Sequence, residues 1–287
     1  MNLSKDTVRY LNVISERSIA IGVRGEFTKN VLESYGINNA RVIGCPSNFL
    51  NPDVDLHKRL DTAFSSLLDS DEYLGKIAFY PQLGAHLRDE ENHLSESKIF
   101  QLCKDNNASY VVNAPENFIG LARGRYDEIE AKHIRGLHKK IGVQYDYSEF
   151  ASFLYSNSKT FTSISDWLEY SSRLLFSAGK RIHGALNTLQ TGKPGIIIYH
   201  DSRTRELAET IGVPRISSSN FEKISSIDNL LTMVEWSAAE YRDKRSSLWS
   251  EYKAIFQDNG LKLPYDLSPR EKNSAIDKLV PALAVGC

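Results

Sequence analysis

The sequence predicts an α/β protein built on a parallel β-sheet with helices on both faces. Short runs of strand-forming residues alternate along the chain with segments in which apolar residues recur at helical spacing. The run at residues 195–199 (GIIIY) is apolar throughout, as strands are when both faces of their sheet are covered. Alternating strands and helices favour parallel pairing. In such sheets, ligands bind outside the carboxyl ends of the strands.

Local patterns assign each element in order. The predicted strands are residues 18–23, 40–43, 76–80, 108–112, 159–162, 173–176 and 195–199. The predicted helices are residues 7–16, 26–35, 55–68, 90–105, 126–140, 165–171, 182–191 and 204–211. From about residue 228 to residue 258, apolar residues are interleaved with charges, which indicates one long or broken helix packed on the body.

A change of composition at residues 44–53 indicates a linker, because two prolines, a glycine and two asparagines interrupt the periodicity there. We therefore divide the chain into a partial N-terminal α/β domain (1–50), a C-terminal α/β domain (51–225) and a helical segment with a tail (226–287). The first part buries little surface by itself. We expect it to pack on the second domain and the C-terminal helix, to pair with another subunit in a homo-oligomer, or to belong to a longer protein.

Composition excludes several classes of protein. The 35 basic and 36 acidic residues give a net charge of -1, so no general attraction to nucleic acid or to an anionic membrane is expected. Three widely spaced cysteines argue against a disulfide framework or a structural zinc site. No stretch approaches the roughly 18 apolar residues of a membrane span, and no signal-peptide core follows Met1, so we expect a cytoplasmic protein. The glycine-rich dinucleotide, P-loop, esterase and zincin motifs are also missing.

The most informative segment is SAGKRIHGAL at residues 177–186. It places Arg181 and His183 where a predicted strand gives way to a predicted helix. Free N–H groups and the helix dipole favour negative charge at such a point. Arg24 stands in a similar place, between the strand at 18–23 and the helix from residue 26. We predict that Arg24 faces Arg181 and His183 across a cleft that binds an anion and can protonate it.

Other polar residues follow predicted strands and are candidates for the same cleft, because functional residues gather in such loops. They are Gln82, His86, Arg88, Asn113, Glu116, Asn117, His200, Asp201 and Arg203. His86 and Asp201 are the strongest of this set, although His200 and Asp201 could instead order their loop.

Five segments in order resemble the polysaccharide pyruvyl transferase family. They are IGVRGEFT (21–28), VIGCPS (42–47), GKRIHGA (179–185), GKP (192–194) and YHDSRTREL (199–207). The resemblance covers about residues 15–215 and implies a two-domain, GT-B-like fold with Rossmann-like domains and phosphoenolpyruvate bound between them. The chain departs from the family in lacking the usual N-terminal part with a Gly-Asn-x-Gly-Asp loop.

The resemblance also implies an activity, in which a pyruvyl group moves from phosphoenolpyruvate to hydroxyls of a sugar in polysaccharide or cell-wall glycan biosynthesis. The product is a pyruvate ketal, the partners are phosphoenolpyruvate and a sugar or glycan-lipid acceptor, and no cofactor or metal is required. Arg24 and Arg181 suit the carboxylate and phosphate of the donor. His183 is either the acid or a phosphate ligand, and Gly184 belongs to the same substrate-binding motif.

Two other classes stay open. A GT-B-type glycosyltransferase that uses a nucleotide sugar would place Arg181 on a diphosphate and use Glu116 or Asp201 on the ribose or as a base. A catalytically inactive, truncated binding protein of the same fold is the third possibility.

Overall fold

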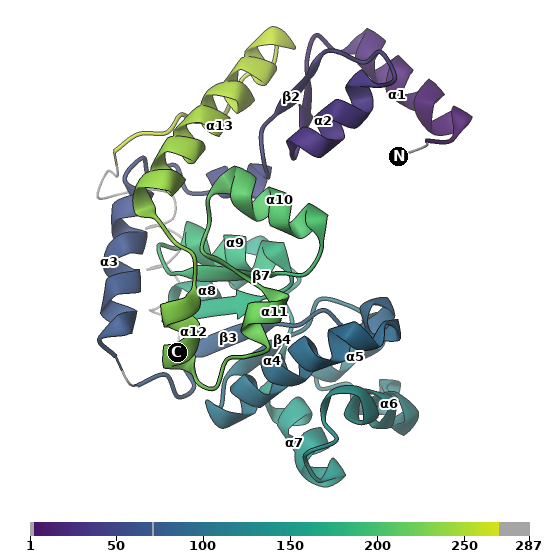
Figure 1. The fold of residues 1–287 in the computed structure, drawn as a ribbon, viewed down its shortest axis with the longest axis vertical. Coiled ribbons are helices and arrows are strands. Elements are labelled where there is room, and N and C mark those ends of the chain that lie inside the picture. The colour runs from purple at the N-terminus through teal and green to yellow at the C-terminus, as the bar shows by residue number, and fades with distance from the viewer. Residues whose placement is uncertain (1–2, 71, 270–287) are drawn as a thin grey trace.

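The protein contains a large and a small parallel β-sheet (Figure 1). The computed structural model describes residues 3–70 and 72–269. The strands of the large sheet are β3 (Ile77–Tyr80), β4 (Ser109–Val111), β5 (Ser158–Lys159), β6 (Phe176–Gly179), β7 (Gly195–Tyr199) and β8 (Arg215–Ser217). They lie in the order β5-β4-β3-β6-β7-β8, and every neighbouring pair is parallel.

The order of these six strands reverses between β3 and β6. From β3 the chain moves outward to β5, returns to form β6 on the other side of β3, and moves outward again to β8. Numbered along the sheet, this is the 3-2-1-4-5-6 order of Rossmann-type folds. Tyr80 lies opposite Gly179, so the loops after β3 and β6 leave the sheet side by side. A crevice between such loops is the usual ligand site of an α/β sheet.

Helices cover both faces of this sheet. They are α3 (Leu56–Leu68), α4 (His93–Asp105), α5 (Glu116–Ala122), α6 (Ala131–Ile141), α7 (Tyr147–Asn157), α8 (Ile164–Ser172), α9 (Ile182–Gln190), α10 (Ser202–Ile211), α11 (Ser218–Phe221) and α12 (Ile227–Met233), with short 3-10 turns η1 (Pro46–Phe49), η2 (Gly84–Arg88), η3 (Glu90–Asn92) and η4 (Tyr126–Glu128). Alternate residues of β3 enter different cores, since Phe79 packs with the cluster around α4 and Tyr80 packs with Trp167 of α8. Burial on both faces explains why this strand is apolar throughout.

The small sheet consists of β1 (Ile21–Val23) and β2 (Ala40–Val42), with α1 (Lys5–Arg17) and α2 (Glu26–Glu33). Its core is a group of four buried side chains: Val23, Leu32, Ile37 and Ala40. Because so small a core contributes little stability, contacts with the rest of the chain are needed to hold it.

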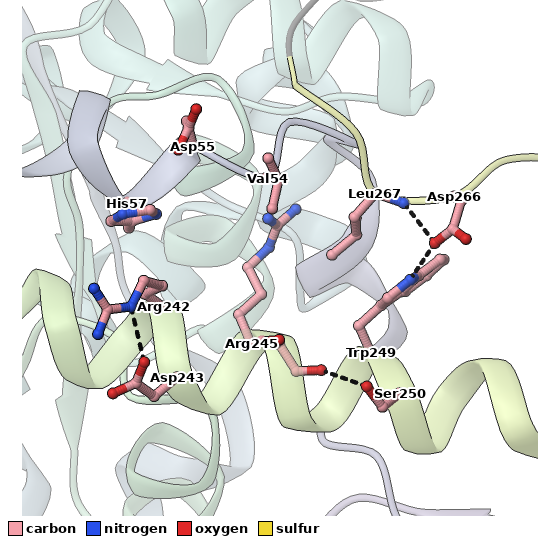
Figure 2. Close-up of a pocket in the computed structure, with 11 residues that line it drawn as sticks. Val54, Asp55, His57, Arg242, Asp243, Arg245, Trp249, Ser250, Asp266 and Leu267 are labelled. Atoms are coloured by element: carbon pink, nitrogen blue, oxygen red, sulfur yellow. Dashed lines mark hydrogen bonds and ion pairs between the residues drawn. The ribbon is translucent and has the colours of Figure 1, made fainter.

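A long helix, α13 (Ala238–Asp258), joins the two sheets (Figure 1). At its far end, Asp258 forms an ion pair with Arg41 of β2 at 2.7 Å, and the Asn259 side chain donates to the carbonyl of Ala20 at 3.0 Å. In its middle, buried Arg245 donates to three backbone carbonyls of residues 48–53. Figure 2 shows this arginine reaching from the helix to the segment at Val54. Helix α13 therefore stabilises the connection between the sheets.

The predicted α/β class and parallel sheet are confirmed, and β7 has the predicted bounds. The strand predicted at 173–176 was wrong, because β6 is Phe176–Gly179. Its small residues lack the usual strand pattern: a side chain at Gly179 would lie 2.4 Å from the carbonyl oxygen of Tyr80. Helices α5, α7 and α11 and strand β8 were missed. The helical stretch from 228 is broken into α12 and α13, because Glu235 pairs with Arg215 of β8.

The three-part division of the chain stays a prediction, since the arrangement of the elements does not show which parts fold independently. Residues 270–287 of the predicted tail, including Cys287, lie outside the described residues. Among the helices of 3–70 and 72–269, none has both the length and the apolar character needed to cross a membrane.

Candidate anion-binding site

A cavity of about 240 Å³ lies where the small sheet meets the carboxyl ends of the large sheet. It is lined by Arg24, Gly25, Thr28, Gln82, Lys180, Arg181, Ile182, His183, Arg203, Thr204, Glu206 and Leu207. Three loops and one helix contribute to it: the turn after β1, the loop after β3, the turn from β6 into α9, and the first half of α10. The cavity therefore occupies the crevice at which the strand order of the large sheet reverses.

Arg181 is the N-cap residue of α9, with an extended backbone and no capping side chain. Its half-buried guanidinium lines the cavity, and its Nε atom has no hydrogen-bond partner among the described residues. Burial lowers the pKa of Arg181 from its ordinary value. Because an unpaired buried donor is costly, this nitrogen is suited to an anion that would complete its hydrogen bonding.

Arg24 reaches the same cavity from the turn between β1 and α2. The next residue, Gly25, is buried against the carboxylate of Glu206 from α10, and a side chain there would lie 2.6 Å from that group. Glu206 Oε1 in turn accepts a hydrogen bond of 2.6 Å from the backbone N–H of Phe27. This carboxylate satisfies the start of α2 and fixes the small sheet beside the cavity.

His183 lies in the first turn of α9, where its exposed side chain lines the cavity. Behind it, the buried thiol of Cys45 lies 3.0 Å from the Ser47 hydroxyl. Burial raises the pKa of Cys45, but hydrogen bonds from His183 and Ser47 outweigh burial and lower it to about 7. Cys45 therefore connects the segment after β2 to the imidazole predicted to act on the substrate.

Lys180 and Glu96 form a buried ion pair beside the cavity, with both side chains 0% exposed and 3.5 Å between Nζ and Oε1. Lys180 Nζ also donates to Ser95 Oγ at 2.6 Å and to His86 Nε2 at 3.2 Å. Burial is the main cause that lowers the pKa of Lys180 and raises that of Glu96, the latter to about 7. Burial, with Lys180 and His200, lowers the pKa of His86 to about 4, so its ring is neutral and accepts from the lysine.

Of the other predicted site residues, Gln82 and Arg203 also line this cavity, whereas the remaining ones lie outside it. Gly184 faces the ring of Tyr80, where a side chain would come within 2.3 Å, so this glycine allows α9 to approach β3. His86 is held behind the cavity by Lys180, and its ring meets that of His200 edge-on at 4.7 Å. Asp201 caps α10, accepting from the N–H and the hydroxyl of Thr204, each at 2.6 Å. The structure thus places Arg24, Arg181 and His183 together with Gln82 and Arg203, and their roles stay predictions.

Glu96 and Lys180 are not among the site residues predicted from the sequence. A signal for Glu96 was present, because helical spacing places it on the same face of α4 as Ile99, Phe100 and Cys103, which are all buried. Burying a lone carboxylate on an apolar helix face is costly unless a partner is buried with it, so Glu96 indicates such a partner. The corresponding signal for Lys180 is its position directly before Arg181, at the end of the buried strand β6.

Other hollows are present in the described part of the chain. One, of about 430 Å³, lies between α3 and α13 and is lined in part by His57, Arg242 and Trp249 (Figure 2). Another, of about 600 Å³, lies near Asp201 and Glu222. Neither contains Arg24, Arg181 or His183. Across residues 3–70 and 72–269, no group of three or more His, Cys, Asp or Glu side chains could hold a metal ion.

The fold and the site define an α/β protein of Rossmann type with a cation-lined pocket at the point where its strand order reverses. The family model of polysaccharide pyruvyl transferases matches residues 2–202. The chain belongs to this family. Membership indicates, at the level of the family, a transferase with a pyruvyl donor and a glycan acceptor. Searches of curated proteins and of solved structures found no match.

Proposed function

We propose that this protein transfers the pyruvyl group of phosphoenolpyruvate to two hydroxyls of a sugar in a polysaccharide or cell-wall glycan, forming a pyruvate ketal. The observation that carries the proposal is the convergence of Arg24, Arg181 and His183 on one cavity. Phosphoenolpyruvate carries a carboxylate and a phosphate, and two guanidinium groups match these two anions. The start of α9 adds backbone N–H groups and the positive end of a helix dipole.

The reaction begins with a proton transfer to C3 of the donor, which turns its methylene into a methyl group and leaves C2 electron-poor. One sugar hydroxyl adds to C2, the C2–O bond to phosphate breaks, and a second hydroxyl adds to complete the ketal. The two hydroxyls give up two protons, one of which balances the proton placed on C3 while the other leaves with inorganic phosphate. Arginines near the phosphate favour its departure, since they stabilise the charge that it gains.

His183 has two possible roles that can be separated by experiment. As the acid that protonates C3, it would affect turnover more than donor binding. As an imidazolium ligand of the phosphate, it would affect both. We propose the acid role, because the side chain is exposed to the cavity and interacts with Cys45, whose pKa it lowers.

Donor binding tests this function. Calorimetry with phosphoenolpyruvate is expected to show binding by the wild-type protein, with affinity lowered at least tenfold in Arg24→Ala. His183→Asn is expected to bind the donor within a few-fold of wild type but to release phosphate at least a hundredfold more slowly in the presence of an acceptor glycan. Arg173→Ala is the matched control, because this arginine is 69% exposed and pairs with Glu169 outside the cavity. Binding of a nucleotide sugar instead of phosphoenolpyruvate would overturn the proposal.

A further inference from the structure

The buried ion pair of Lys180 and Glu96 is not explained by a contribution to the stability of the fold. Both charges are removed from water, and Glu96 Oε2 has no hydrogen-bond partner among the described residues. Replacing such a pair with apolar residues is often neutral or stabilising, so a buried pair is weak evidence of a role in stability. Its position instead suggests a role in the site, since Lys180 directly precedes Arg181.

Contacts connect this pair to two walls of the cavity. The backbone N–H of Gln82, a residue that lines the cavity, donates to Glu96 Oε1 at 3.2 Å. On the other side, Lys180 anchors the turn from β6 into α9 to Ser95 of α4 at 2.6 Å. The charge of Glu96 acts on both Lys180 and Arg181 and shifts the pKa of each upward against the effect of burial. A change of charge at Glu96 therefore changes the electrostatic environment of Arg181, the arginine proposed to bind the anion.

Titratable groups face the pair from every element packed around it. They are Lys180 and Arg181 from the β6–α9 turn, His86 from η2, Cys103 from α4 itself, Tyr110 from β4, His200 after β7 and Glu222 after α11. His86 is neutral near pH 7, and burial raises the pKa of both Cys103 and Tyr110 well above their ordinary values. Burial raises the pKa of Glu96 to about 7, so this carboxyl changes charge near neutrality.

We propose, on the basis of the proposed function, that Lys180 and Glu96 are positioning residues of the donor site. Lys180 holds the turn that carries Arg181, and Glu96 takes up one proton when phosphoenolpyruvate binds. The bound anion adds negative charge next to Glu96, which disfavours a second anion and favours the neutral acid. An O–H bond forms at Glu96, and the proton comes from solvent. The net charge of the buried pair rises by one and offsets part of the charge of the donor.

Infrared difference spectroscopy reads this step directly, because the C=O band of a protonated carboxyl is separate from that of a carboxylate and His183 does not contribute to it. At pH 7, adding phosphoenolpyruvate to the wild-type protein is expected to produce a protonated-carboxyl band. The band is expected to be missing in Glu96→Gln, a variant of nearly the same shape. Glu149→Gln is the matched control and keeps the band, because this glutamate is half exposed and pairs with Lys104 away from the cavity.

Lys180→Met provides a second measurement. Without the ammonium, Glu96 is expected to be protonated before the donor is added, so the band is present from the start and does not grow. Donor affinity is expected to fall at least tenfold, since the turn carrying Arg181 loses its anchor. If phosphoenolpyruvate binds but no band appears, or if the band persists in Glu96→Gln, the inference is wrong and the proposed function stands. If phosphoenolpyruvate does not bind at all, the proposed function fails and the inference fails with it.

Discussion

Replacing Arg181 by methionine is expected to separate stability from binding. The half-buried guanidinium leaves Nε unpaired among the described residues, and an unsatisfied buried group costs about 1–3 kcal/mol. Methionine keeps the apolar stem and removes that cost, but it also loses the favourable interaction with Glu96. We therefore expect the free energy of unfolding to rise by about 1 kcal/mol.

Donor binding is expected to change in the opposite direction. Arg181 would make two hydrogen bonds to an anionic group, and bonds to charged groups contribute about 1.5–3 kcal/mol each. A loss of about 3 kcal/mol lowers the affinity for phosphoenolpyruvate by a factor of about 150. If both results are found, Arg181 lowers the stability of the unliganded protein and strengthens donor binding.

Urea unfolding and calorimetry on the same preparations measure both quantities. Arg173→Met is the control, because its side chain is largely exposed on the surface and lies outside the cavity. It is expected to leave both unfolding and donor binding within experimental error of wild type. Two results would contradict these expectations: a loss of more than about 2 kcal/mol of stability in Arg181→Met, as a core deletion would cause, or wild-type affinity of this variant for phosphoenolpyruvate.

Two further predictions concern the surroundings of the site. Gly184→Ala is expected to destabilise the protein by about 1–3 kcal/mol in urea unfolding, because its Cβ would meet the ring of Tyr80 at 2.3 Å. The control is Gly136→Ala, which is expected to stabilise the protein by about 0.5 kcal/mol because nothing lies within 4 Å of its Cβ. Equal changes in stability in the two variants would contradict the close packing of Gly184 on Tyr80. Thiolate absorbance is expected to show Cys45 titrating at a pKa of about 7, with His183→Ala moving that pKa upward; a titration unchanged in this variant would refute the contact. Because the pKa of Cys45 is depressed in the folded state, its contribution to stability is present above the pKa of the unfolded thiol and is lost as the pH falls through about 7.

Local sequence determined the class of fold and the chemistry of the strand ends. The apolar run at 195–199 predicts the bounds of β7, and the junction at 177–186 predicts Arg181 and His183 at the start of a helix. Both predictions depend on residues that are neighbours along the chain, so periodicity and helix-start chemistry are sufficient to make them.

Only the tertiary structure decided what each of these residues contacts. The carboxylate that fixes the start of α2 comes from Glu206, 179 residues away, and Ser95 contacts Lys180 across 85 residues. Such contacts depend on the order of the strands in the sheet. That order is determined by the crossover connections between distant parts of the chain, so no local sequence pattern predicts it. The position of Arg181 and His183 at the start of a helix could be predicted because helix-start chemistry is local. The buried Lys180–Glu96 pair behind them required the packed sheet, because only burial makes that pair chemically distinctive.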